Sequence, residues 1–196
     1  MNKNCVKLLY LLVVFVFICS KSWADEGGSS KFFKGIEVLV GAADGRVSGP
    51  QRYKLIPVVV DFDFDLKYFT KKIGFNPPML LDFQIEPYIA AVYQPNTNVE
   101  FGNGFILKIG FLPDTWTFQP YFKIGPGILY TTQHTANQST QFNFFEYAGV
   151  GMHYFFKKNI ALTVEYRYRH LSNAYIKTPN WGIENQFILG GIAYKF

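Results

Sequence analysis

Cysteine is almost absent from this chain. Of its 196 residues only Cys5 and Cys19 are cysteines, and both lie in the first 24 residues. We expect residues 1–24 to be removed and residues 25–196 to form a single domain. That domain would hold no disulfide, no thiol nucleophile and no thiolate metal site.

Long hydrophobic runs are also missing beyond the N-terminus. The only extended run covers residues 8–18, which is too short for a membrane-spanning helix of about 20 residues. Lys3 and Lys7 precede this run, and a small-x-small sequence at 22–24 follows it. This order is typical of a cleaved secretory signal peptide.

The chain also lacks a large excess of positive or negative charge. The net charge of +5 includes three lysines of the expected signal peptide, which leaves 16 Lys and Arg against 14 Asp and Glu. A nearly balanced, exported domain gives no reason to expect nucleic acid as a partner. The sequence contains no nucleotide or metal motif, so we expect no cofactor and no metal.

Aromatic residues, in contrast, are abundant, at 19% of the chain. The remainder of the chain divides into eight segments in which apolar and polar residues alternate. A tilted barrel strand needs about 9–11 residues to cross a membrane, and most of the segments are long enough. The segments are 35–43, 53–66, 79–93, 98–111, 115–131, 141–156, 159–172 and 183–196.

This pattern predicts an all-β fold: an eight-stranded antiparallel transmembrane β-barrel of the outer membrane, preceded by a cleaved signal peptide. A secreted β-sandwich would share the alternation. The final strand, which ends in Phe196, resembles the assembly signal of Gram-negative outer-membrane proteins. One connection fits poorly, because residues 67–78 are long for a periplasmic turn.

Alternation also predicts which side chains face the inside of the barrel. Apolar residues of one parity would face lipid, and the charged residues of the other parity would fill a polar interior. The expected interior charges are Asp61, Asp63, Asp65, Glu86, Lys123, Glu165, Arg167 and Arg169.

Three residues near the C-terminus suggest chemistry. His170, Ser172 and Glu184 are the side-chain types of a serine-hydrolase triad. By parity all three point outward, at the external ends of two adjacent strands. Each also has an ordinary interpretation, as a structural histidine, a turn serine or a rim charge. His134 and His153 have no such neighbours and are expected to be structural or surface residues.

The segment from His170 to Glu184 resembles the signature of the lipid A 3-O-deacylase (PagL) family of outer-membrane enzymes. The resemblance implies a serine esterase that removes the 3-O-linked hydroxyacyl chain from lipid A of lipopolysaccharide. It also implies that His170, Ser172 and Glu184 form the triad, that Asn173 contributes to the oxyanion site, and that Asn180 supports the site.

Two alternatives remain open at this stage. A non-enzymatic structural or adhesive barrel would not need the three residues together. A lipid A acyltransferase would hold its donor chain inside the barrel, where the expected charges make a poor acyl pocket. For all of these interpretations we expect the Gram-negative outer membrane as the location. For the deacylase we expect lipid A of lipopolysaccharide as the substrate. The sequence leaves a homodimer open.

Overall fold

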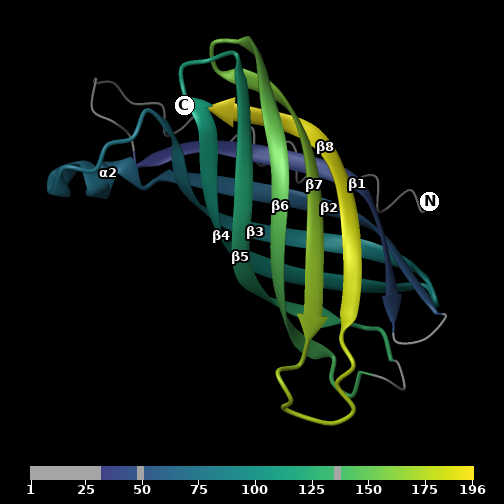
Figure 1. The fold of residues 1–196 in the computed structure, drawn as a ribbon. Helices are drawn as coiled ribbons and strands as arrows, with labels where there is room; N and C mark the ends of the chain where they lie inside the picture. The colour runs from purple at the N-terminus through teal and green to yellow at the C-terminus, as the bar shows by residue number, and fades with distance from the viewer. Residues whose placement is uncertain (1–31, 48–50, 135–137) are drawn as a thin grey trace. The chain divides into compact units, whose positions relative to one another are not determined.

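The described part of the chain forms one closed antiparallel β-barrel of eight strands, each paired with its neighbours in sequence order (Figure 1). The structure is a computed structural model, and it describes residues 32–47, 51–134 and 138–196. The expected signal peptide, residues 1–24, lies outside the described residues. Within the described ranges, no helix is long and apolar enough to cross a membrane.

The eight strands follow the alternating segments of the sequence closely. Strand β1 pairs with both β2 and β8, which closes the barrel. The strands are β1 (Phe33–Val47), β2 (Arg52–Asp65), β3 (Met79–Gln94), β4 (Asn98–Pro113), β5 (Phe118–Thr131), β6 (Phe142–Lys157), β7 (Ile160–Ser172) and β8 (Ile183–Lys195).

Alternation forms this barrel because successive side chains of a strand point to opposite faces. On β7, Leu162, Val164 and Tyr166 are exposed on the outer wall, while Thr163 and Glu165 are buried inside. The same period runs through the other strands. The outer wall is therefore apolar and rich in aromatic rings, as a surface in contact with lipid requires.

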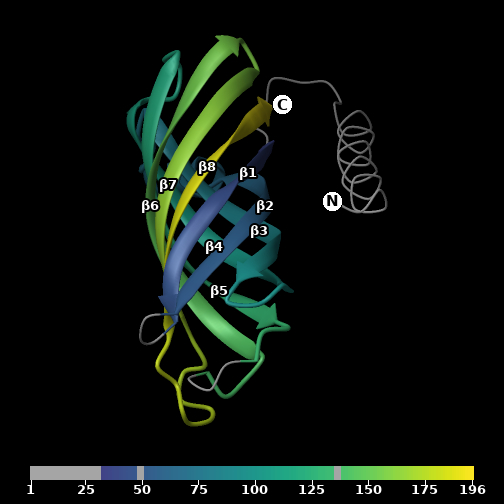
Figure 2. The same cartoon turned by 90° about the vertical axis from the view of Figure 1, so that its right-hand side faces the viewer.

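The long connection at residues 67–78 contains a short helical segment. It begins with α2 (Lys67–Thr70), continues as the 3-10 turn η1 (Lys71–Ile73) and ends at Gly74. Figure 1 shows this segment projecting from one end of the barrel. The β5–β6 and β7–β8 connections lie together at the opposite end, as both views show (Figures 1 and 2).

The barrel interior contains paired charges, as the sequence predicted. All eight of the expected interior charges are buried. The Lys123 ammonium group lies 2.9 Å from the Asp61 carboxylate and 3.2 Å from that of Glu86. Arg167 contacts Glu86 at 2.5 Å, and Arg169 contacts Glu100 at 2.7 Å. The interior therefore combines a packed network of charges with a cluster of buried apolar side chains, among them Leu39, Leu55 and Leu189.

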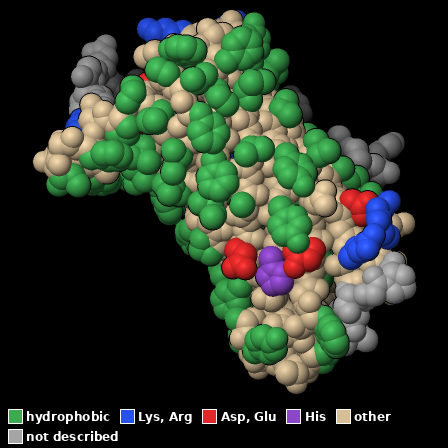
Figure 3. Space-filling model, viewed as in Figure 1, with side chains coloured by type: hydrophobic (Ala, Val, Ile, Leu, Met, Phe, Trp, Pro, Cys, Tyr) green, Lys and Arg blue, Asp and Glu red, His purple; other side chains and the backbone are tan. Residues whose placement is uncertain are grey.

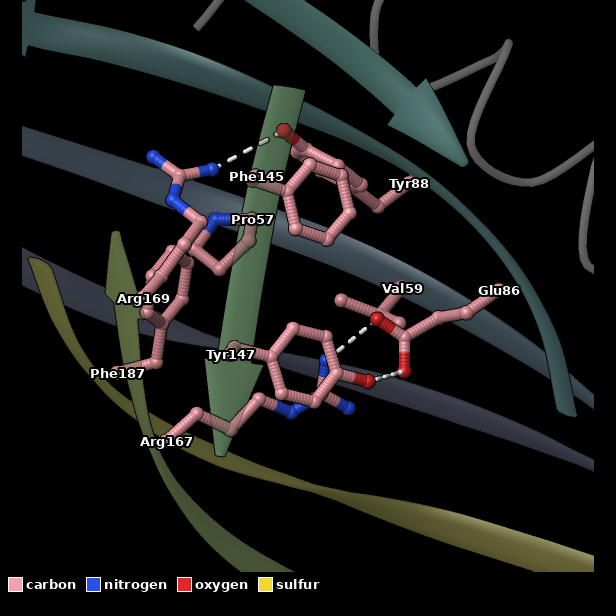
Figure 4. A pocket seen from close by; sticks show the side chains of 9 residues that line it. All are labelled: Pro57, Val59, Glu86, Tyr88, Phe145, Tyr147, Arg167, Arg169 and Phe187. Carbon is pink, nitrogen blue, oxygen red and sulfur yellow. Dashed lines mark hydrogen bonds and ion pairs between the residues drawn. The ribbon is translucent and has the colours of Figure 1, made fainter. Parts of the chain in front are cut away.

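A small cavity remains within this network, lined by nine residues from five strands (Figure 4). Its volume is about 20 Å³, roughly the room that one water molecule needs. The Tyr147 hydroxyl donates to Glu86 at 2.6 Å, and Arg169 donates to the Tyr88 hydroxyl at 3.0 Å across the cavity. No acyl chain fits in this space.

Candidate active site

The outward-facing ends of β7 and β8 bring His170 and Glu184 together. The two residues are direct cross-strand partners, and the His170 Nδ1 atom is hydrogen-bonded to the Glu184 carboxylate. Their side chains are 37% and 45% exposed, so both are accessible from outside the barrel. The sequence predicted that these residues share one face of adjacent strands, but it did not predict the register. The register of the structure makes them direct partners.

Ser172 follows His170 by two residues on the same strand and the same face. The two Cα atoms are therefore about 6.6 Å apart along the strand. The Ser172 hydroxyl makes no hydrogen bond to any described residue. Catalytic hydrogen bonds are often loose before substrate binds, so this spacing is compatible with transfer of the hydroxyl proton to the imidazole.

A second carboxylate flanks His170 from the other side. Glu146 on β6 is the cross-strand partner of His170 in the β6–β7 pair. Figure 3 shows a histidine between two acidic side chains on an otherwise largely hydrophobic face. Because the His170 ring contacts Glu184, the structure distinguishes the two carboxylates, and Glu184 is the partner that orients the imidazole.

The loop between β7 and β8 is fixed by two asparagines. The backbone N–H of Asn173 donates to the Asn180 side-chain oxygen at 2.9 Å. The fully buried Asn173 amide group donates to the Lys177 carbonyl at 2.8 Å and to the Ser139 hydroxyl at 3.2 Å. Both asparagines thus support the loop. The oxyanion role of Asn173 stays a prediction, and in this conformation its N–H donors are engaged by Asn180, Lys177 and Ser139.

Gly182 lies against the candidate base. Its φ of +76° falls in the left-handed region that favours glycine. A Cβ atom at this position would lie 2.8 Å from Cε1 of His170. The sequence shows Gly182 as a turn residue only, and its contact with the imidazole was not predicted.

The other two histidines lie apart from this site. His153 is buried in the barrel interior, where Nδ1 is 2.8 Å from the Thr163 hydroxyl and Nε2 is 3.4 Å from the Lys108 ammonium group. His134 is exposed beside Gln141. Both agree with the structural or surface roles expected for them. The described residues contain no group of His, Cys, Asp or Glu able to hold a metal ion.

Comparison with known protein families gives one match that covers most of the chain. Residues 60–192 match the family described as lipid A 3-O-deacylase (PagL). The chain belongs to the PagL family. The matched region contains His170, Ser172 and Glu184. A comparison with curated proteins gave no match.

Solved structures with a similar fold are also outer-membrane barrels. The crystal structure of the outer-membrane enzyme PagL has a TM-score of 0.59 at 19% identity, over 78% of this chain and 97% of that one. Neisserial surface protein A has a TM-score of 0.62 at 14% identity, over 83% of this chain and 97% of that one. At these identities the likeness concerns the fold.

The closed barrel, its apolar outer wall and its PagL family together make this a protein of the Gram-negative outer membrane. The description of the family names the lipid and the bond, an acyl chain at the 3-O position of lipid A. The candidate site lies on the outside of the barrel.

Proposed function

We propose that this protein is a serine esterase that removes the 3-O-linked hydroxyacyl chain from lipid A. The observation that carries the proposal is the His170–Glu184 pair on the lipid-facing wall, two residues from Ser172 on the same face. The three side-chain types of a serine triad share one face there, in a chain of the PagL family. A site on the outside of a barrel receives a lipid laterally from the membrane.

The proposed reaction follows the logic of a serine triad. Glu184 accepts a hydrogen bond from Nδ1–H of His170, which leaves Nε2 free to take the proton of the Ser172 hydroxyl. The Ser172 oxygen attacks the ester carbonyl. The imidazolium then returns the proton to the sugar oxygen as the carbon–oxygen bond breaks. Water, activated by the same histidine, releases the fatty acid from the serine.

The developing negative charge on the ester oxygen requires hydrogen-bond donors. The backbone N–H groups of Ala174 and Tyr175 follow the nucleophile closely and donate to no described residue. Both residues have positive φ, at 51° and 59°, so the chain turns sharply just after Ser172. We assign these amides to the oxyanion site beside the predicted Asn173. Losing one such donor typically costs 10²–10³ in rate.

The packed interior argues against the acyltransferase alternative. That reaction would keep a donor chain inside the barrel, but the internal cavity of about 20 Å³ lies among buried charges. The fold alone does not separate an esterase from a non-enzymatic barrel, since barrels that lack this site can have the same fold. Hydrolysis at the outer wall is the function that uses His170, Ser172 and Glu184 together.

Substitution of the nucleophile tests the function directly. In cells that make the protein, we expect lipid A to lose one hydroxyacyl chain by mass spectrometry and a free 3-hydroxy fatty acid to be released. Ser172→Ala should abolish both changes because no nucleophile remains, while the variant should keep the heat-modifiable migration of a folded barrel.

The matched control is Thr115→Ala, which removes an exposed hydroxyl group from the turn between β4 and β5, at the other end of the barrel. This variant should deacylate lipid A like the unaltered protein. Full activity in Ser172→Ala would disprove the triad.

A further inference from the structure

A groove lies beside the candidate triad, on the same outer wall. It has a volume of about 420 Å³ and crosses the seam where β1 and β8 close the barrel. Its lining includes Glu184 of the triad, and the reaction described above uses none of the other side chains. The lining side chains are Asp44, Arg46, Arg52, Tyr168, Glu184 and Gln186.

Strand register aligns two arginines with the triad. Arg52 on β2 opposes Arg46 on β1, and Arg46 opposes Glu184 on β8, the partner of His170. Neighbouring strands are about 4.7–4.9 Å apart, so the Cα atoms of Arg46 and His170 are separated by roughly 10 Å. Both arginines are exposed on the outer wall. Arg52, Arg46, Glu184 and His170 therefore form one row across four neighbouring strands, with the two arginines beside the proposed triad.

Only one of the two arginines of this row is ion-paired. Like charges directly opposite each other on a sheet are destabilising, yet Arg46 and Arg52 are direct partners. Arg52 forms an ion pair with Asp44. Arg46 forms none with the described residues, and its other neighbour, Glu184, contacts His170. The arrangement has room for one more anion beside Arg46.

The height of the row in the membrane favours a lipid head group. Arginine on the lipid-facing wall costs about 2–4 kcal/mol at mid-membrane and about 0–1 kcal/mol near the interface. The arginines lie at the end of the barrel that carries the β7–β8 loop, level with the triad. Guanidinium groups bind phosphate through paired hydrogen bonds, which fix orientation as well as charge.

We propose that Arg46 and Arg52 form a subsite for a phosphate on the sugar head group of the lipid substrate. Binding of this phosphate in the groove places the neighbouring 3-O ester beside Ser172 and leaves the acyl chains along the apolar wall. The inference rests on the proposed function, because it names the part of lipid A that the same site recognises.

The test compares lipid A with enzymatically dephosphorylated lipid A of identical acylation, using purified protein in detergent micelles. We expect Arg46→Gln to lower kcat/KM on phosphorylated lipid A about tenfold or more, as for loss of one hydrogen bond to a charged group. The loss on the dephosphorylated lipid should be at least tenfold smaller. Arg46→Lys should recover part of the difference, since it keeps the charge.

Lys158→Gln is the matched control, since this exposed cation lies in the β6–β7 turn at the opposite end. It should not distinguish the two lipids. Equal losses on both lipids in Arg46→Gln would overturn the proposal and make Arg46 a structural partner of Glu184.

A binding measurement separates this proposal from the proposed function. In the Ser172→Ala background, phosphorylated lipid A should bind more tightly than the dephosphorylated lipid, and Arg46→Gln should remove the preference. If unaltered protein cleaves neither lipid but the preference is present, the esterase function fails and the subsite stands. If Ser172→Ala binds both lipids equally, the subsite is disproved.

Discussion

At the scale of single residues, Gly182 links the backbone of the β7–β8 loop to the imidazole of His170, the proposed base. Its φ of +76° and its closeness to the His170 ring both favour glycine at this position. A side chain here would have to push against the ring that must receive the serine proton. Small displacements of a catalytic group are costly, since about 1 Å can reduce a rate by 10².

Gly182→Ala should therefore lower kcat about 10²-fold while the barrel still folds. Activity on lipid A and heat-modifiable migration would be measured together. The matched control is Gly74→Ala, because Gly74 also has a positive φ, of +81°, but a Cβ there meets nothing within 4 Å. This control carries the same kind of backbone strain at the other end of the barrel and should remain active. Comparable losses in both variants would show that strain alone, without the imidazole contact, explains the effect.

Some residues of the site could be predicted from the sequence and others could not. His170, Ser172 and Glu184 stand out because their types and their alternation agree. Arg46 and Arg52 also have the outward parity, but only the register across the β1–β8 seam shows that they lie beside Glu184. That register joins residues more than 130 positions apart, and period-two alternation fixes which face each side chain takes but not which residues become partners.

At the scale of elements, the β7–β8 loop is held by specific polar contacts. The backbone N–H of Ser139 donates to the Pro179 carbonyl at 3.1 Å, and Gln138 forms a β-bridge with Asn180. The part of the loop that precedes β8 is thus tied to the β5–β6 connection. The amides assigned to the oxyanion site lie in this loop, so its anchoring affects the chemistry.

Asn180→Ala removes the oxygen that accepts the Asn173 backbone N–H. We expect kcat/KM to fall about 10–100-fold, because the loop after the nucleophile loses its anchor, while the free energy of unfolding changes by about 1–3 kcal/mol at most. Asn180→Asp keeps an acceptor oxygen and should retain most of the activity. Steady-state kinetics and urea unfolding would measure the two effects, and an unchanged rate in Asn180→Ala would contradict the anchoring role.

Element boundaries were predictable where alternation is strong. Each of the eight expected segments corresponds to one observed strand. The segment at residues 67–73 was not predicted, because α2 and η1 are four and three residues long and too short to show a helical period. The long connection that fitted poorly with a periplasmic turn contains this compact helical segment.

At the scale of the whole molecule, the interior charge network stabilises the barrel beside a cluster of buried apolar side chains. Glu86 is its clearest centre, with contacts to Lys123, Arg167 and Tyr147. Removing one partner of a buried ion pair is strongly destabilising, by about 3–5 kcal/mol, because the other charge stays buried.

Glu86→Gln should accordingly lower the free energy of unfolding by about 3–5 kcal/mol in urea titrations of the protein in lipid vesicles. Asp44→Asn serves as the control for stability, since it breaks the ion pair with Arg52, whose partners are 48% and 44% exposed. Such exposed pairs contribute about 0–1 kcal/mol. A change below about 1 kcal/mol in Glu86→Gln would mean that the network does not stabilise the barrel as argued.

The closing seam between β1 and β8 has a consequence for when the protein can act. The β7–β8 hairpin can bring His170 and Glu184 together by itself, but Arg46 reaches Glu184 only once the first and last strands have paired. A chain whose barrel has not yet closed would carry the proposed triad residues without the groove that we propose for the substrate. Hydrolysis would then depend on closure of the barrel, so that only the fully assembled protein would be active.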